Sequence, residues 1–196
     1  IFGADPFTSG EIKVKGQPVT IKSCEQAKKL GLALLTEDRK SQGLILEFSL
    51  NQNISLANMN TAMTPFGFNK AKETAHNQKL ADSMRVKTPS LEQKAKNLSG
   101  GNQQKVILSR ELESAPDVLI AVHPTRGLDI GATRFVHDQM IAARDRGVGI
   151  LLISADFDEI LEMSDRIVVC FEGEIMGEFS GKNPPVEEIS LAMTGK

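Results

Sequence analysis

Three short apolar runs, set among longer segments of helical character, occupy the second half of the chain. The runs are VLIAV (118–122), GILLIS (149–154) and IVVCF (167–171). Helices are expected before the first run, from about Gly101 to Glu113, and after it, from about Ala132 to Arg146. Strands that are apolar on both faces are typical of parallel sheets covered on both sides. The alternation therefore predicts an α/β fold built on a parallel sheet.

Shorter elements are expected on either side of this region. The segment EIKVKGQPVTI (11–21) alternates apolar and polar residues around a turn, which predicts a β-hairpin. Ser23 is expected to cap a short helix that ends at Leu30, and LALL then forms a buried strand that ends at Thr36. A second hairpin is expected around Gly173, and a final helix near Pro185.

Residues 50–97 are expected to form a helical subdomain within a single domain of residues 1–196. Two helices between Leu50 and Arg85 are divided by the breaker-rich TPFGFN (64–69), and Pro89 closes the segment. Met59 and Met63 have helix-compatible spacing, so we expect them to fill the core.

The composition is that of an ordinary globular protein and argues against several classes of function. The chain is 40% hydrophobic, and its net charge of -2 comes from mixed acidic and basic residues, which excludes a basic stripe for nucleic acid. Cys24 and Cys170 lie far apart without a CxxC, so reduced thiols are expected. His76 and His137 have no neighbouring metal ligands in sequence and are expected on the surface. No apolar run approaches the ~20 residues that span a bilayer.

The segment LSGGNQQK (98–105) places a hydroxyl and two glycines directly before a helix. Ser99 can cap that helix, while Gly100 and Gly101 carry no side chain that would keep an anion away from the backbone N–H groups. Such a helix start attracts phosphate through its free donors and its dipole. A plain capped helix behind a glycine turn explains the same residues, and both interpretations remain open from the residues alone.

About twenty residues later, HPTRGLDIGA (123–132) follows the apolar run VLIAV. Together with LSGGNQQK, in this order, it resembles the signature loop and the Walker B to D-loop passage of ABC ATPases. The NQQK ending, the EDRK segment (37–40) and PTRGLD (124–129) resemble more narrowly the second nucleotide-binding half of tandem ATPases that energise monosaccharide and nucleoside importers. The resemblance covers essentially the whole chain.

The resemblance implies that two such domains meet head to tail and hold ATP between them. By position, Ser99, Gly100 and Gly101 would contact the γ-phosphate of ATP bound to the opposite domain, with Asn102 and Gln103 following at the helix start. Asp129 would be the D-loop residue that crosses the interface, although the same carboxylate can simply cap the next helix. ATP and Mg²⁺ would be held mainly by the partner domain.

Four positions depart from the active pattern of this family. No GxxxxGK[ST] loop occurs in these 196 residues, so this sequence is expected to lack the segment with that loop and the leading strands, which either has been cut away before Ile1 or was never present. Val122 and His123 stand where Asp and Glu are usual, Ala155 where the switch His is usual, and Glu37 where Gln is usual. Valine cannot hold water on Mg²⁺. His123 is either a base when neutral or an imidazole that only hydrogen-bonds in the interface. This segment alone is predicted to be inactive.

The resemblance also implies partners outside this chain. They are an amino-terminal ABC half or second ABC subunit, two membrane-spanning permease subunits and an extracytoplasmic binding protein. The domain would then lie in the cytoplasm, on the inner face of the membrane, and never touch the sugar or nucleoside. Glu37, Asp38 and Arg39 would belong to the coupling loop whose neighbourhood (43–57) faces a permease, although TEDRK is also typical of a solvated turn. Arg39 and Arg126 either contact a partner or are solvated.

Two other functions remain as alternatives. A non-transport ABC ATPase acting in translation or DNA repair would be expected to carry a long charged coiled coil or basic surfaces, and neither pattern occurs in the sequence. A non-catalytic interaction module would not need the signature residues and Asp129 together.

Overall fold

A computed structural model describes residues 1–6 and 8–195 of the chain. Residues Ile1–Leu151 and Leu152–Lys196 form two compact units, and each is described by itself.

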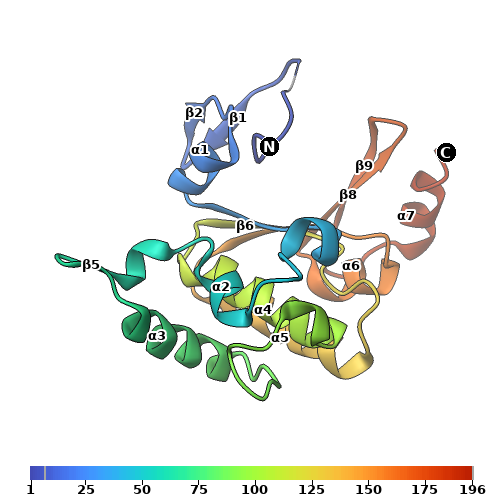
Figure 1. Ribbon diagram of the computed structural model, residues 1–196. Coiled ribbons are helices and arrows are strands. Elements are labelled where there is room, and N and C mark those ends of the chain that lie inside the picture. The colour runs from blue at the N-terminus through green and yellow to red at the C-terminus, as the bar shows by residue number, and fades with distance from the viewer. Residues whose placement is uncertain (7, 196) are drawn as a thin grey trace. The chain divides into compact units, whose positions relative to one another are not determined.

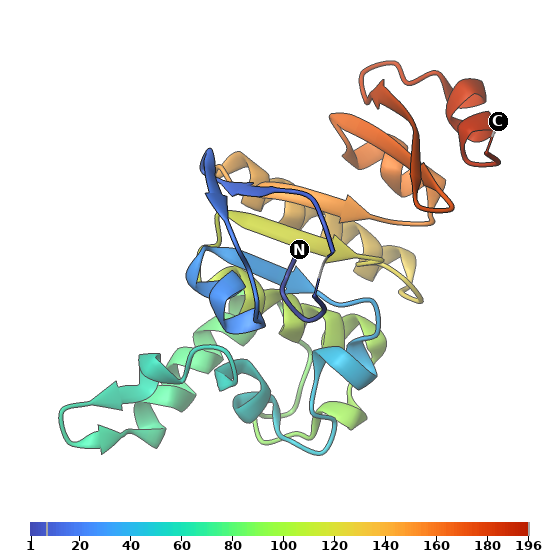
Figure 2. The ribbon, with the colours of Figure 1, turned by 90° about the horizontal axis from the view of Figure 1, so that it is seen from above.

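The sheet of the first unit confirms the expected strands. Its order is β3 (Leu32–Leu35), β6 (Val118–Val122) and β7 (Gly149–Ile153), with β6 in the middle (Figure 2). β3 pairs with β6 in parallel, Leu32 opposite Val118 and Leu35 opposite Ala121. The two strands are largely buried, whereas Leu151 on the edge strand β7 is 40% exposed. The expectation that every strand is covered on both faces is therefore wrong for β7.

A hairpin and a short helix cover one face of β3 and β6. The hairpin is β1 (Ile12–Val14) and β2 (Gln17–Val19), and the helix is α1 (Cys24–Lys29), capped by Ser23 as predicted. They lie on one side of β6 in Figure 1. Ile21 and Ala27 are buried here against Leu32 and Ile120. This cluster forms a small apolar core of its own.

Two long helices lie on the other side of the sheet (Figure 1). They are α4 (Gly100–Glu113) and α5 (Ile130–Asp145), close to the predicted bounds. Val106 and Leu108 of α4 and Val136 of α5 are no more than 1% exposed. Burying each such side chain contributes about 1.5–3 kcal/mol relative to exposure. The apolar face of α4 therefore fixes the start of that helix, at Gly100, relative to the sheet.

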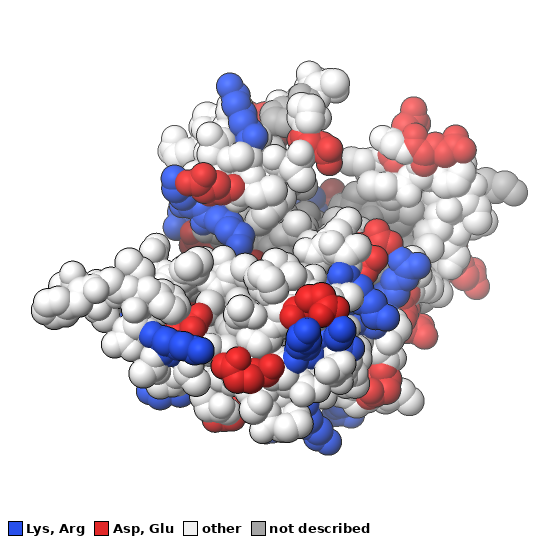
Figure 3. Space-filling model, in the orientation of Figure 1, with Lys and Arg blue, Asp and Glu red and all other residues white. Residues whose placement is uncertain are grey.

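Residues 50–97 contain the expected helices and a small hairpin that was not predicted. The elements in chain order are α2 (Leu50–Ser55), a 3-10 helix η2 (Met59–Ala62), β4 (Met63–Thr64), β5 (Gly67–Phe68), α3 (Lys70–Ser83) and a 3-10 turn η3 (Ala95–Asn97). Because α2 ends at Ser55, helical spacing does not continue to Met59 and Met63, and they are 56% and 47% exposed. The expectation that both methionines fill the core is wrong. The hairpin forms the uncharged projection in Figure 3.

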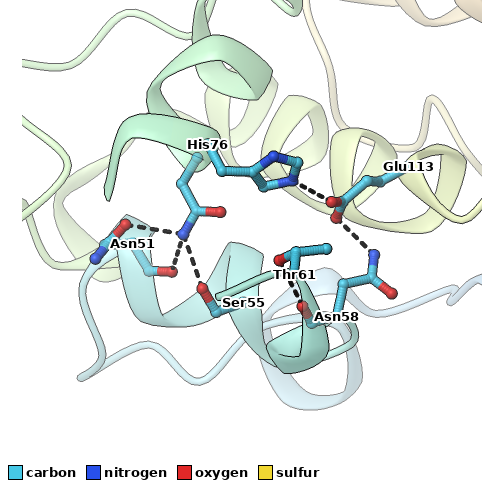
Figure 4. A network of polar contacts seen from close by, with 7 residues as sticks. Asn51, Ser55, Asn58, Thr61, His76 and Glu113 are labelled. Atoms are coloured by element: carbon cyan, nitrogen blue, oxygen red, sulfur yellow. Dashed lines mark hydrogen bonds and ion pairs between the residues drawn. The ribbon is translucent and has the colours of Figure 1, made fainter. Parts of the chain in front are cut away.

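Polar side chains join α2, α3 and the end of α4 (Figure 4). The buried amide of Asn77 donates to the backbone and side-chain oxygens of Asn51. His76 pairs with Glu113, whose other oxygen accepts a hydrogen bond from Asn58. His76 is thus half-buried in a network rather than a free surface residue, and His137 is also half-buried. Both differ from the expected surface histidines, and for His76 the cause is helix packing, which brings Glu113 to it.

The second unit is a hairpin packed against two helices. Its elements are α6 (Phe157–Met163), β8 (Arg166–Phe171), β9 (Glu174–Ser180) and α7 (Val186–Ala192), and the hairpin turn at Glu172 and Gly173 is the one predicted. Ile167 and Val169 of β8 are buried with Ile189 and Ala192 of α7. Within the described residues, no helix is long and apolar enough to span a bilayer.

Candidate functional site

The amino end of α4 presents a hydroxyl and two bare glycines. Ser99 is exposed in extended backbone, and its Oγ accepts the backbone N–H of Asn102 at 3.4 Å. Gly100 and Gly101 form the first turn of a fourteen-residue helix whose dipole is positive at this end. The predicted cap is therefore confirmed, with Ser99 exposed and Gly100 and Gly101 half-buried.

The amino end of α5 abuts the same segment. A Cβ placed on Gly101 would lie 2.8 Å from the Cβ of Ala132. Asp129 caps α5, since its Oδ1 accepts the N–H of Ala132 at 2.9 Å. The capping role that the sequence allowed for Asp129 is confirmed, while its role across an interface remains a prediction. The amino ends of α4 and α5 thus lie side by side, and the Asp129 carboxylate already supplies a negative charge to the end of α5.

Asn102 and Gln103 make contacts within the chain. The Asn102 side chain accepts the N–H of Lys87 at 2.9 Å and donates to Ser99 Oγ at 3.1 Å. Gln103 is only 2% exposed, and its Nε2 donates to the carbonyl of Ala95 at 3.0 Å. The Gln103 side chain thus faces the interior, and its contact with nucleotide stays a prediction.

Lys105, at the end of the NQQK motif, is also held within the chain. Its Nζ donates to the carbonyl of Arg85 at 3.0 Å and lies 4.3 Å from the centre of the Phe135 ring. Burial, followed by the charges of Lys87 and Arg85, lowers the pKa of the Lys105 ammonium. The ammonium therefore anchors α4 to its neighbours and does not join the Ser99–Gly101 segment.

The TEDRK segment is a structured turn beside this surface. Asp38 caps a π-helical turn (Arg39–Gly43), and hydrogen bonds from the Ser41 side chain and the N–H groups of Lys40 and Ser41 hold the pKa of Asp38 below its usual value. Glu37 pairs with Arg126 at 2.5 Å, and Arg39 Nη1 donates to the carbonyl of Arg126 at 2.7 Å. Sequence reasoning missed these contacts, because 87 and 89 residues separate the partners. The turn is more than a solvated loop.

A pair of lysines upstream of Ser99 ties that region to residues 46–48. Glu47 contacts Lys96 at 2.8 Å and Lys94 at 3.1 Å, and the N–H of Ala95 donates to the carbonyl of Phe48. These contacts join the chain leading into α4 to the start of the helical subdomain. They place Glu47 in a local field of two positive charges.

We expect Glu47 to titrate below its usual pKa of 4.5, because hydrogen bonds from Lys96 and then Lys94 stabilise the carboxylate. A lowered folded-state pKa means that these pairs contribute stability above about pH 4.5 and lose it as the pH falls through the folded-state value. Carbon-detected NMR titration measures this pKa. Lys96→Gln should raise the pKa of Glu47, whereas Lys79→Gln should leave it unchanged. A Glu47 pKa at or above 4.5 in the unsubstituted protein would contradict the expectation.

The residue that ends β6 carries no metal-binding side chain. Val122 is the last residue of β6, and its side chain has no oxygen to offer a cation or its bound water. His123 follows with a φ of 45°, a left-handed conformation uncommon outside glycine. The described residues contain no group of three His, Cys, Asp or Glu side chains that could hold a metal. Ala155, at the switch position, is an exposed residue directly before the cap of α6.

Comparisons with known proteins agree on one family. The family described as ABC transporter matches residues 1–126. The ribose import ATP-binding protein RbsA of Oceanobacillus iheyensis is 43% identical over 196 residues, which cover 100% of this chain and 39% of that protein. The protein of the same name from Bacillus subtilis (strain 168) is 40% identical, covering 100% and 40%. The chain thus spans about two fifths of the length of these relatives.

Solved structures show the same fold. A nucleotide-free ATP-binding cassette from an ABC transporter has a TM-score of 0.77 at 21% identity, covering 99% of this chain and 77% of that one. The ADP conformation of the cassette MJ1267 has a TM-score of 0.74 at 20% identity, covering 99% and 76%. The parallel sheet with its antiparallel hairpins is therefore the fold of an ATP-binding cassette.

Proposed function

Since this chain belongs to the ABC transporter family, we propose that it presents Ser99, Gly100 and Gly101 to ATP that is held mainly by a partner ATP-binding domain. The observation that carries the proposal is the convergence of two helix amino ends on an exposed serine and two glycines. Backbone N–H groups at such a place fit the oxygens of a triphosphate. Asn102 follows this segment directly. Its side chain donates to Ser99 Oγ and accepts the N–H of Lys87, which supports the segment.

The hydrolytic site formed by this domain's own residues is proposed to lack the groups needed for catalysis. Metal-assisted phosphoryl transfer requires a carboxylate near Mg²⁺ and a group that orients the attacking water. Val122 and Ala155 supply neither, Glu37 is paired with Arg126, and His123 has no carboxylate before it. Mg²⁺ would therefore be held by the partner domain, where it would neutralise the charge on the phosphates. Of the two ATP sites formed between paired domains, this domain contributes Ser99–Gly101 to the active one. The other site, formed by this domain's own catalytic positions, is weak.

The proposed partners follow from the kinship with ribose import ATP-binding proteins. They are an amino-terminal ABC half or second ABC subunit, and permease subunits that hold the domain at the inner face of a membrane. Glu37, Asp38 and Arg39, with residues 43–57, would face a permease. A monosaccharide, ribose-like in chemistry, is the proposed cargo, and it does not touch this domain.

Chemical labelling of Ser99→Cys in the intact protein tests whether ATP reaches this segment. Cys24 and Cys170 are exposed and are first replaced by serine. A maleimide should label Ser99→Cys rapidly without nucleotide and at least about tenfold more slowly with saturating ATP, because the closed partner domain covers the thiol. Ser83→Cys, on exposed α3, is the control and should label equally in both conditions. Labelling of Ser99→Cys that ATP leaves unchanged would favour a non-catalytic interaction module instead.

A further inference from the structure

The guanidinium of Arg39 lies across the backbone of Gly100. A Cβ placed on Gly100 would meet Arg39 Nη2 at 2.8 Å and Cζ at 3.3 Å. Arg39 Nη2 is also 3.6 Å from where a Cβ on Gly127 would be. One planar group therefore fills the space between the first residue of α4 and the loop after β6.

Hydrogen bonds fix this guanidinium from one side. Arg39 Nη1 donates to the carbonyl of Arg126 at 2.7 Å, and the Arg126 side chain returns to Glu37 at 2.5 Å. Segment 37–39 thus holds Arg126 at two points, since Arg39 binds its carbonyl and Glu37 binds its guanidinium. Arg39 Nε is buried and has no hydrogen-bond partner in the structure, so the group is held there despite an unsatisfied donor.

We propose that Arg39 is a positioning residue that couples the Glu37–Gly43 turn to the Ser99–Gly101 segment, so that displacement of the turn moves Gly100. The inference rests on the proposed function, since it assigns to that turn control over a segment that meets ATP. A partner that binds residues 37–43 and displaces them would thereby change, through the Arg39 side chain, how Gly100 meets the nucleotide. A methyl group at Gly100 would also push the Arg39 guanidinium away from the carbonyl of Arg126. The contact therefore requires glycine at this position, in addition to the requirement for access of phosphate to the backbone.

The test measures the ATP concentration that gives half-maximal protection of Ser99→Cys in the intact, otherwise cysteine-free protein. Arg39→Gln should raise this concentration at least about fivefold, the lower end of typical coupling between sites. Arg39→Lys keeps the charge but not the planar group over Gly100, so this substitution should also raise the half-protection concentration. Lys79→Gln removes a charge from an exposed residue outside the turn and should leave this concentration within about twofold. Thermal unfolding of each variant, measured in parallel, separates lost positioning from lost folding.

A double-mutant cycle with Gly100→Ala decides whether the contact itself is responsible. Gly100→Ala alone should raise the half-protection concentration, because its methyl group displaces the guanidinium. In the Arg39→Gln background the same change should raise the concentration by a smaller factor, because only the direct obstruction of the phosphate by the methyl group remains. The proposal would be overturned if the two substitutions raised the half-protection concentration by factors that simply multiply. It would also be overturned if Arg39→Gln and Arg39→Lys left that concentration at the value of the unsubstituted protein. Absence of ATP protection in the unsubstituted Arg39 background would instead refute the proposed function.

Discussion

Ser99→Arg is expected to reduce ATP turnover by the intact protein at least about 100-fold, the loss typical when a donor group that stabilises a transition state is removed. The serine is exposed at the meeting point of two helix amino ends, so an arginine side chain would occupy the place proposed for the γ-phosphate. It would also remove the Oγ that caps α4, at about 1 kcal/mol, which leaves the fold intact. Steady-state phosphate release measures the effect.

Two variants show whether the loss belongs to this position. Ser114→Arg makes the same change at the opposite, carboxyl end of α4, where a cation suits the helix dipole, and should keep turnover within about twofold. His123→Ala should have a small effect, within about threefold, because no metal carboxylate precedes it at Val122. Full turnover by a folded Ser99→Arg protein would mean that the Ser99–Gly101 segment is only a capped helix start.

Asn53→Asp is expected to destabilise the first unit by about 3 kcal/mol or more. Asn53 is fully buried, and its Oδ1 accepts the N–H of Ile45 at 2.9 Å. Its Nδ2 donates to the carbonyls of Ile45 at 3.0 Å, Ser49 at 3.0 Å and Phe48 at 3.4 Å. An aspartate of the same shape turns these donations into contacts between a buried carboxylate and carbonyl oxygens. The segment 45–49, part of the surface proposed to face a permease, would lose its fixed conformation.

Urea unfolding at two pH values measures this loss and identifies its cause. Burial disfavours the charged form, so the destabilisation should be largest near pH 7.5 and smaller near pH 5, where part of the aspartate is protonated and can donate one hydrogen bond. Asn60→Asp, the same change on an exposed residue, should alter the free energy of unfolding by less than about 0.5 kcal/mol. A destabilisation that is the same at both pH values would show that charge burial is not the cause.

Local patterns predicted most of the regular elements because those elements are determined by local chemistry. The buried strand β6 is a continuous apolar run, Ser23 and Ser99 are capping residues, and both predicted hairpins turn where a glycine stands. Met59 and Met63 were predicted wrongly because spacing alone does not show where a helix ends. Met63 begins the β4–β5 hairpin, which arises where the sequence indicated only a break between helices.

The candidate site was predictable where one segment carries it and not where several segments meet. Ser99, Gly100 and Gly101 lie in one motif, and a helix start explains the exposure of Ser99. The burial of the Gln103 side chain could have been predicted, because its spacing from Val106 and Ile107 puts it on the buried face of α4. The Arg39 and Glu37 contacts with Arg126 depend on how β3 and β6 pair, which brings residues nearly ninety positions apart to the same edge of the sheet.

The contact between Gly101 and Ala132 limits which residues evolution can place at either position. With 2.8 Å between the alanine Cβ and the site of a Cβ on Gly101, the space holds a single methyl group. An alanine at position 101 therefore demands a glycine at 132, and any residue larger than alanine at 132 would push the two helices apart. Among relatives that keep these helices in contact, the two positions should vary together, so that their summed volume stays that of one glycine and one alanine.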